Sequence, residues 1–324
     1  MRTPKTLATS LLSLSAAALL AICAAGGATA STVAAQDKKA PQVASQSVDG
    51  SRAADYWTPE RMKSAIPGDV LADKALARGN KSSAATVEKG ASTQISGKAA
   101  KGKTTLHADE SPISNIGKVF FTMGGSNYVC SGNSVTSTNK STVSTAGHCV
   151  NEGPGAFATN FVFVPAYLNG AAPYGKWAAK ALYTTTQWSS AGDMQYDTGF
   201  AVVSPLNGQN LSDVVGSSGV QFNAARGLTY KSYGYPAAAP FDGQSLKSCT
   251  GPASDDPNNP QFNAQGIPCD MTGGSSGGPW FIGTSSSGYQ NSINSYGYGS
   301  RSTVMYGPYW GSVIQQAYST AAAA

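Results

Sequence analysis

The chain has 324 residues, 41% of them hydrophobic and 12% charged, which is enough for one large domain or several small ones. Its formal net charge of +5 belongs to the first 110 residues, which carry 14 Lys and Arg against 9 Asp and Glu, whereas the rest carries 8 of each. The C-terminal part therefore has no basic excess, and this argues against nucleic acid as a partner.

The first 30 residues have the pattern of a secretory leader. Arg2 and Lys5 precede an apolar run over 7–25, and small residues lead up to Ala30. No second apolar stretch is long enough to cross a bilayer. We therefore expect a signal peptide over 1–30 and a secreted, extracellular product that has no membrane attachment after processing.

Residues 31–110 are rich in Ala, Ser and Lys and contain only two aromatic residues, Tyr56 and Trp57. Such a composition buries little apolar surface, so we expect a largely disordered segment. One short helix is predicted over Pro59–Ala65, because Thr58 can cap it and proline suits the first helical position. A segment between leader and body is where a propeptide would lie, although a surface linker would have the same composition.

Residues 111–324 have a different sequence pattern, in which short β-prone runs alternate with clusters of turn-forming residues. Many short strands separated by turns predict an all-β barrel or sandwich. Near the C-terminus, Val313, Ile314 and Ala317 share one face of a predicted helix over 312–320. The β-prone runs are Val119–Thr122, Thr142–Ser144, Phe161–Val164, Gly199–Val203, Leu228–Tyr235 and Pro279–Ile282.

The cysteines fit an exported protein. Removal of the leader would discard Cys23 and leave an even number, which favours disulfides over free thiols. Four cysteines allow three pairings, and their spacing does not suit a zinc site, so we expect neither a metal nor a cofactor. The four are Cys130, Cys149, Cys249 and Cys269.

Three segments together carry the residue types of a nucleophilic site. A serine hydroxyl is a weak nucleophile at neutral pH and needs an adjacent base, which in turn needs an orienting group. The chain offers His148 in TAGHC, Asp197 in DTGFAVV and Ser276 in GSSGGP. Each segment alone has an ordinary structural explanation, but the three together, behind a leader, favour catalysis.

These motifs, in the order His, Asp, Ser, resemble those of the trypsin/chymotrypsin family of serine peptidases. The resemblance covers roughly 116–318 and includes Cys130-Ser131-Gly132 and the cysteine beside the histidine. It implies an all-β fold of two antiparallel β-barrels over 111–324, with a C-terminal helix and an active site between the barrels.

The resemblance also implies a role for each residue. Ser276 would attack the scissile carbonyl, His148 would take its proton, and Asp197 would orient the imidazole. The backbone N–H groups of Gly274 and Ser276 would form the oxyanion hole. We therefore expect a secreted, monomeric serine endopeptidase whose partners are polypeptide substrates and its own propeptide over 31–110.

Among the three disulfide pairings, we favour the sequential one. Cys130–Cys149 and Cys249–Cys269 would each bracket one of the site segments, and the first matches the disulfide that the family places beside its histidine. One feature departs from the family, because Ser275 stands where trypsin-like zymogens carry an aspartate that receives the new N-terminal amine. Activation by such an ion pair is therefore not expected.

Specificity can be predicted only from the resemblance. Asp270 lies six residues before Ser276, where trypsin-like members carry the acid at the base of the pocket, and this predicts cleavage after Arg or Lys. Ser295 and Gly297 resemble the strand that binds the substrate backbone. The unusual position of Cys269 makes it ambiguous how the residues around the specificity pocket align with those of the family. Asp270 could equally be a loop acid beside a disulfide.

Two further groups have no role in this interpretation. His107 falls in the expected propeptide and is predicted to be solvated. The loop over 255–259 offers two carboxylates to calcium, although an exposed loop of this composition is the simpler explanation.

Two other functions remain open from the sequence. An exported esterase or acyltransferase could use the same three residues, and a binding protein could retain a protease fold without catalysis.

Overall fold

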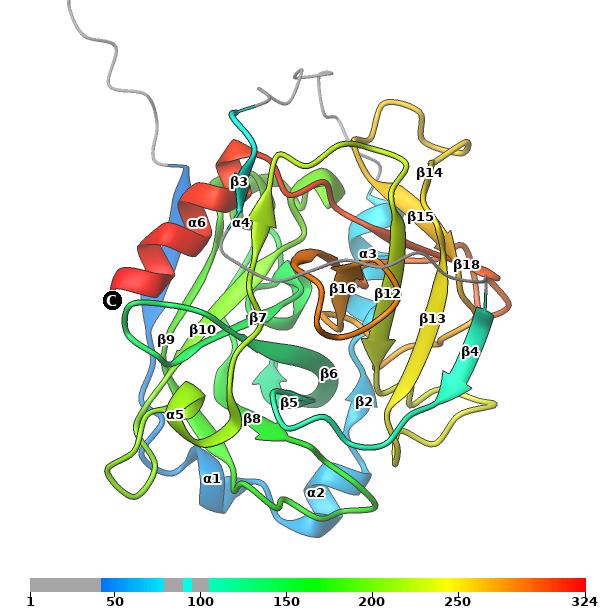
Figure 1. Cartoon of the computed structure of the whole chain (residues 1–324). Coiled ribbons are helices and arrows are strands. Elements are labelled where there is room, and N and C mark those ends of the chain that lie inside the picture. The colour runs from blue at the N-terminus through cyan, green and yellow to red at the C-terminus, as the bar shows by residue number, and fades with distance from the viewer. Residues whose placement is uncertain (1–41, 79–89, 95–104) are drawn as a thin grey trace, which may run out of the picture. The chain divides into compact units, whose positions relative to one another are not determined.

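The structure is a computed structural model that describes residues 42–78, 90–94 and 105–324. The expected leader over 1–30 lies outside these ranges. Most of the described elements are strands, with short helices between them and a longer helix near the C-terminus (Figure 1). No helix in the described part of the chain is long and apolar enough to span a membrane.

The first half of the body is a closed barrel of six antiparallel strands. They are β5 (Ile116–Met123), β6 (Ser126–Val135), β7 (Thr142–Thr145), β8 (Thr159–Pro165), β9 (Trp177–Thr185) and β10 (Gly199–Val203). β5 pairs with β6 and β8, and the ring continues from β6 through β7, β10 and β9 back to β8. One of the two expected barrels is therefore present and complete.

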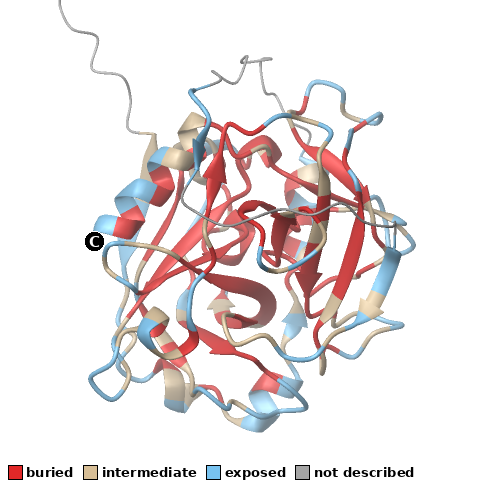
Figure 2. Ribbon diagram, viewed as in Figure 1, coloured by how far each residue is buried: buried red, intermediate tan, exposed pale blue. Residues whose placement is uncertain are grey.

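Both faces of β5 are buried, which explains its nearly continuous apolar sequence. Successive side chains of a strand point to opposite faces. Val119 and Phe121 pack inside the barrel, whereas Ile116 and Phe120 pack outside it in a second cluster that includes Trp57. The strands around this interior are buried over most of their length (Figure 2).

The second half of the body consists of two antiparallel sheets. The five-stranded sheet has the order β17 (Gln290–Ile293), β16 (Pro279–Ile282), β12 (Thr229–Gly234), β13 (Lys247–Pro252) and β4 (Thr105–Asp109). The three-stranded sheet has the order β14 (Ser254–Asp255), β15 (Gln265–Pro268) and β18 (Val304–Gly307). A disulfide from Cys249 in β13 to Cys269, directly after β15, joins the two sheets.

Strand β4 lies within the segment expected to be the propeptide. Residues 105–109 were assigned to the propeptide, but they pair with β13 in the five-stranded sheet, with Asp109 opposite Lys247. Residues 105–109 are therefore part of the five-stranded sheet.

The segment over 42–78 is ordered, in contrast to the disorder that its composition predicts. Its elements are β1 (Val43–Ser47), α1 (Ala53–Tyr56), α2 (Pro59–Lys63), β2 (Ile66–Pro67) and α3 (Asp69–Ala77). The helix predicted after Thr58 is present as α2, and the Thr58 hydroxyl accepts a hydrogen bond from the Arg61 N–H at 3.3 Å. The composition argument fails because the segment uses the apolar surface of the body and needs no core of its own.

The C-terminal helix α6 (Ser312–Ala323) covers the first barrel as predicted, and extends three residues beyond 320. Ile314, Ala317 and Tyr318 enter the barrel core, where Tyr318 contacts Phe200 with ring centroids 5.8 Å apart. The remaining short elements are β3 (Thr93–Gln94), β11 (Gln221–Phe222), α4 (Thr186–Ala191), α5 (Leu211–Val215) and the 3-10 turns η1 (Gly147–Cys149) and η2 (Met194–Tyr196).

Candidate active site

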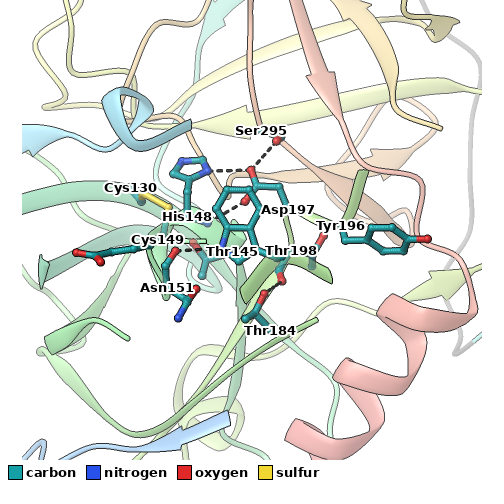
Figure 3. Close-up of polar contacts among 12 residues, drawn as sticks. Cys130, Thr145, His148, Cys149, Asn151, Thr184, Tyr196, Asp197, Thr198 and Ser295 are labelled. Carbon is teal, nitrogen blue, oxygen red and sulfur yellow. Dashed lines mark hydrogen bonds and ion pairs between the residues drawn. A yellow bond between two sulfur atoms is a disulfide. The ribbon is translucent and has the colours of Figure 1, made fainter. Parts of the chain in front are cut away.

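His148 and Asp197 lie together in the interior, each completely buried. His148 is in η1, directly after β7, and Asp197 precedes β10, which pairs with β7. One oxygen of Asp197 accepts the backbone N–H of His148 and the other contacts its Nδ1, both at 2.8 Å (Figure 3). A carboxylate that accepts Nδ1–H selects the tautomer whose Nε2 carries a free lone pair.

A third group completes the surroundings of Asp197. The Ser295 hydroxyl donates to the same oxygen that contacts Nδ1, at 2.6 Å (Figure 3). Ser295 was predicted to bind substrate; it does border the pocket described below, but its hydroxyl is engaged by the buried carboxylate. A desolvated carboxylate needs such donors to remain charged.

The glycine of the histidine motif is required by close packing. A Cβ on Gly147 would lie 2.9 Å from an Asp197 oxygen and 3.0 Å from the Trp188 ring. Trp188 lies beside the imidazole, with ring centroids 6.3 Å apart, and donates its Nε1–H to the Asn151 carbonyl at 3.0 Å. His148 Nε2 has no hydrogen-bond partner within the described ranges.

The loop that carries Ser276 is shaped by glycines in the left-handed region. Gly274 has φ +94° and Gly277 has φ +80°. A Cβ on Gly277 would lie 2.2 Å from the Thr145 hydroxyl, so glycine allows the loop to touch the histidine strand. The Ser131 N–H in β6 donates to the Ser276 carbonyl at 2.7 Å and ties the loop to the barrel.

Two backbone donors in this loop are unused. Within the part of the chain that the structure describes, the N–H groups of Gly274 and Ser276 make no hydrogen bond. Ser275 instead helps to hold the turn, since its hydroxyl donates to the Thr272 carbonyl at 2.8 Å. The loop is thus formed without the aspartate that trypsin-like zymogens use at this position.

A cavity of about 130 Å³ adjoins Ser276. Its walls include Ser295, Tyr296 and Gly297, two of which were predicted to bind substrate. The other residues around the cavity are Asp69, Ala72, Asp73, Ala238, Ala239, Met271, Thr272, Gly273, Ser275, Gly299, Ser300, Ser302, Val304 and Met305. The only charged side chains among them belong to Asp69 and Asp73, which are in the N-terminal helix α3.

Asp270, which the sequence predicts at the base of the specificity pocket, is not among the residues around this cavity. Its carboxylate contacts His107 Nδ1 at 2.7 Å. Its backbone N–H donates to the carbonyl of Leu106, in β4, at 3.4 Å. This contact holds Asp270 beside β4 and outside the cavity. His107 is exposed, as the sequence suggested, with 43% of its side chain accessible, but it is also paired with Asp270.

Asp256 is a residue whose role the sequence did not reveal. It is 1% exposed and accepts hydrogen bonds from the hydroxyls of Tyr296 and Tyr298, at 2.8 and 2.5 Å. Burial and the nearby carboxylate raise the pKa of both tyrosines. Asp255, the other acid of this loop, pairs with Arg226 at 2.6 Å. Asp256 therefore holds Tyr296, which lines the pocket, from 40 residues away in sequence.

The disulfides follow the sequential pairing. Cys130 is bonded to Cys149 and Cys249 to Cys269, with S–S distances of 2.04 and 1.97 Å. Among the described residues, the only cluster of potential metal ligands consists of Cys130, His148 and Cys149. Its two sulfurs are joined to each other, so they do not offer thiolates.

Comparison with solved structures places this geometry in a family. The protease Anisep from Arthrobacter nicotinovorans is 77% identical, with a TM-score of 0.67; the match covers 68% of this chain and 100% of that chain. The chain belongs to the chymotrypsin-like family of bacterial serine proteases. The protease is accordingly a serine endopeptidase with an all-β fold.

Two further structures agree with this assignment. The thermostable serine protease AL20, from an extremophilic microorganism, is 52% identical, with a TM-score of 0.63, and the match covers 65% of this chain and 97% of that one. A Glu endopeptidase shares the fold at 20% identity and a TM-score of 0.53, over 67% of this chain and 97% of the other. No protein-family model matches the chain, and a search of curated proteins found no match.

Proposed function

We propose that the protease is secreted and hydrolyses peptide bonds through an acyl-enzyme on Ser276. The observation that carries this proposal is the fixation of His148 by Asp197 through both its backbone N–H and Nδ1, which leaves Nε2 as the available base. The two disulfides of the body are consistent with an oxidising, extracellular location.

The chemistry follows from these positions. Ser276 Oγ attacks the scissile carbonyl while His148 Nε2 takes its proton, and the Asp197 carboxylate stabilises the imidazolium that results. The tetrahedral oxyanion is held by the N–H groups of Gly274 and Ser276. His148 then protonates the leaving amine, and a water molecule activated by the same nitrogen hydrolyses the acyl-serine.

For the substrate, we propose an uncharged side chain on the amino side of the scissile bond. The hypothesis of cleavage after Arg or Lys depended on Asp270, which lies outside the pocket. The body lines the pocket with hydroxyl, glycine, Tyr296 and methionine groups. A buried guanidinium or ammonium would find no carboxylate of the body there, and such a charge is costly to bury unpaired.

The nucleophile is tested by two adjacent serines. Ser276→Ala should lower kcat for a peptide substrate by at least about 10,000-fold, because the attacking group is lost. Ser275→Ala removes only a hydroxyl that bonds a backbone carbonyl, and should retain activity within about tenfold. Hydrolysis is measured on the secreted form with amide and ester substrates of the same acyl group.

Equal losses in the two variants would show that Ser276 is not the nucleophile. Turnover of the ester alone would identify an esterase instead of an endopeptidase.

A further inference from the structure

The direction of each oxyanion donor is set by the carbonyl of its own peptide group. The N–H of Gly274 shares a peptide with the Gly273 carbonyl, and the N–H of Ser276 follows the Ser275 carbonyl in the same way. Both peptides are trans, and a trans peptide is planar, with its C=O and N–H pointing in opposite directions. The contacts that hold the two carbonyls therefore aim the two N–H groups.

The Ser275 carbonyl is held by residues near the serine in sequence. It accepts the Gly278 N–H at 2.9 Å and the side-chain amide of Asn294 at 3.1 Å. Gly278 belongs to the serine loop itself, and Asn294 directly follows β17. The Ser276 donor is thus aimed from within the second half of the body.

The Gly273 carbonyl is held by the β12–β13 connection, which consists of residues 235–246. It accepts the backbone N–H groups of Ala237 and Ala238, at 2.6 and 3.1 Å. A Cβ on Gly274 would lie only 2.8 Å from the Ala237 Cβ, so the connection packs directly against the serine loop. The Gly274 donor is therefore aimed by the position of this connection.

Lys118 fixes the β12–β13 connection to the first barrel. It lies on β5, is 2% exposed, and its ammonium donates to the Gly243 carbonyl at 2.8 Å. The same ammonium lies 4.5 Å from the centroid of the Tyr167 ring, at a distance where a cation is attracted to an aromatic face. One buried charge thus joins a strand of the barrel to the backbone of the connection.

Gly243 links the lysine to the residues that hold the Gly273 carbonyl. It has φ +72°, and a Cβ at this position would lie 2.8 Å from the Ala237 Cβ and 3.1 Å from the Lys118 Nζ. Its backbone therefore packs between the ammonium and Ala237. The barrel reaches the Gly273 carbonyl through these two contacts.

Two uncharged contacts hold the same end of the connection. The Tyr167 hydroxyl donates to the side-chain oxygen of Gln244 at 3.0 Å, and the Asn169 N–H donates to the Gln244 carbonyl at 2.9 Å. These contacts do not involve the ammonium. We therefore expect the connection to stay folded on the barrel, although less precisely placed, when Lys118 is replaced by an apolar residue.

We propose that Lys118 is a positioning residue for the oxyanion hole, and that it acts through the β12–β13 connection on the peptide between Gly273 and Gly274. This inference rests on the proposed function, since it concerns how the same site is held. Burial of a charge is costly, so an apolar side chain on β5 would serve the stability of the fold at least as well. The contacts of the ammonium with the connection give the lysine a role that stability alone does not.

The test replaces the ammonium by an apolar side chain of similar length. In Lys118→Met, kcat for a peptide substrate should fall about 10- to 100-fold, somewhat less than the loss of a whole oxyanion donor would cause. KM should change by less than about twofold, because the hole stabilises the transition state more than the bound substrate. The matched control is Lys231→Met on β12, whose ammonium pairs with Glu110 at 2.6 Å, and it should stay within about twofold of wild type. Steady-state kinetics on the secreted form give both constants.

A transition-state analogue separates an effect on the hole from a general loss of structure. The probe is a trifluoromethyl ketone with the peptide sequence of the substrate. Ser276 Oγ adds to its carbonyl carbon, the proton passes to His148, and the carbonyl oxygen becomes an anion in the hole. Its Ki should rise in Lys118→Met by the factor by which kcat/KM falls. Gly243→Ala, which presses on both neighbours of Gly243, should raise the Ki as well.

The outcomes distinguish the inference from the proposed function. Unchanged kcat and Ki in Lys118→Met would overturn the inference while leaving Ser276 as the nucleophile. A fall in kcat with an unchanged Ki would also overturn it, because the effect would then lie outside the hole. A wild type that the ketone does not inhibit would contradict the proposed acyl-enzyme mechanism, and the inference with it.

Discussion

Asp197 accepts hydrogen bonds from groups that belong to distant parts of the chain. His148 contributes two of them and Ser295 the third, from 98 residues further on. A carboxylate buried without solvent retains its charge only when such donors replace water. The orientation of the imidazole therefore depends on a residue that the sequence assigns to the substrate wall.

Ser295→Ala tests this dependence. Loss of a hydrogen bond to a charged group is worth about 1.5–3 kcal/mol, so kcat should fall roughly 10- to 100-fold with little change in KM. The matched control is Ser302→Ala, which also lines the pocket but donates to the Val304 carbonyl and not to Asp197. Steady-state kinetics on a peptide substrate would separate the two effects. A raised KM with unchanged kcat in Ser295→Ala would show that the hydroxyl serves substrate binding alone.

Several strands of the body were accessible to sequence reasoning, because short apolar runs between turn-forming residues indicate buried strands. The run over 199–203 is β10, and the run over 161–164 lies within β8. Asp270 was not accessible in this way. Its position depends on β4, a strand more than 150 residues earlier, and no local pattern around Asp270 signals that pairing.

The residues that line the pocket predict which substrate side chain the protease prefers before the scissile bond. With Asp270 drawn away by β4, profiling on a peptide library should show selection for uncharged residues before the scissile bond, and Asp270→Ser should have the same profile as wild type. Discrimination against Arg and Lys should be about tenfold or more, because one unpaired charge in the pocket costs at least about 1.4 kcal/mol. A preference for Arg or Lys that disappears in Asp270→Ser would contradict the geometry.

Lys118 couples the two halves of the molecule. It lies on β5 of the barrel, is 2% exposed, and donates to the Gly243 carbonyl, in the segment before β13, at 2.8 Å. Its ammonium also lies 4.5 Å from the centroid of the Tyr167 ring. Burial lowers the pKa of Lys118 from 10.5 to about 7, and the charge of Asp242 opposes this shift.

This lysine should make stability rise with pH. Between pH 7 and 10.5, Lys118 is protonated to a greater extent in the unfolded chain than in the folded one. The free-energy cost of burying its charge destabilises the folded state fully below pH 7 and is removed as the pH increases. Urea unfolding of the wild type between pH 7 and 9 should show this rise, at most about 1.4 kcal/mol per unit. Lys118→Met should flatten it, and Lys180→Met, an exposed control, should not. An unchanged slope in Lys118→Met would refute the assignment.

At the scale of the whole chain, much of the body could be predicted, whereas the order of residues 42–78 could not. The histidine, aspartate and serine motifs are contiguous and carry their glycines with them, so the sequence shows them plainly. The order of residues 42–78 comes from surfaces such as the one that receives Trp57, which belong to strands far away in sequence. Composition describes a segment in isolation and therefore predicted disorder.

Asn294 supports the serine loop from a position that is late in the chain. Its carbonyl accepts the Gly277 N–H at 2.7 Å, and its side-chain amide donates to the Ser275 carbonyl at 3.1 Å. Ser295 follows it, so a chain emerging from its N-terminus lacks the last supports of both Ser276 and Asp197 until nearly all of it has been made. Residues 42–78 emerge well before that point. During synthesis and export, the surface that receives Trp57 therefore meets the N-terminal segment before the contacts around Ser276 and Asp197 can be completed.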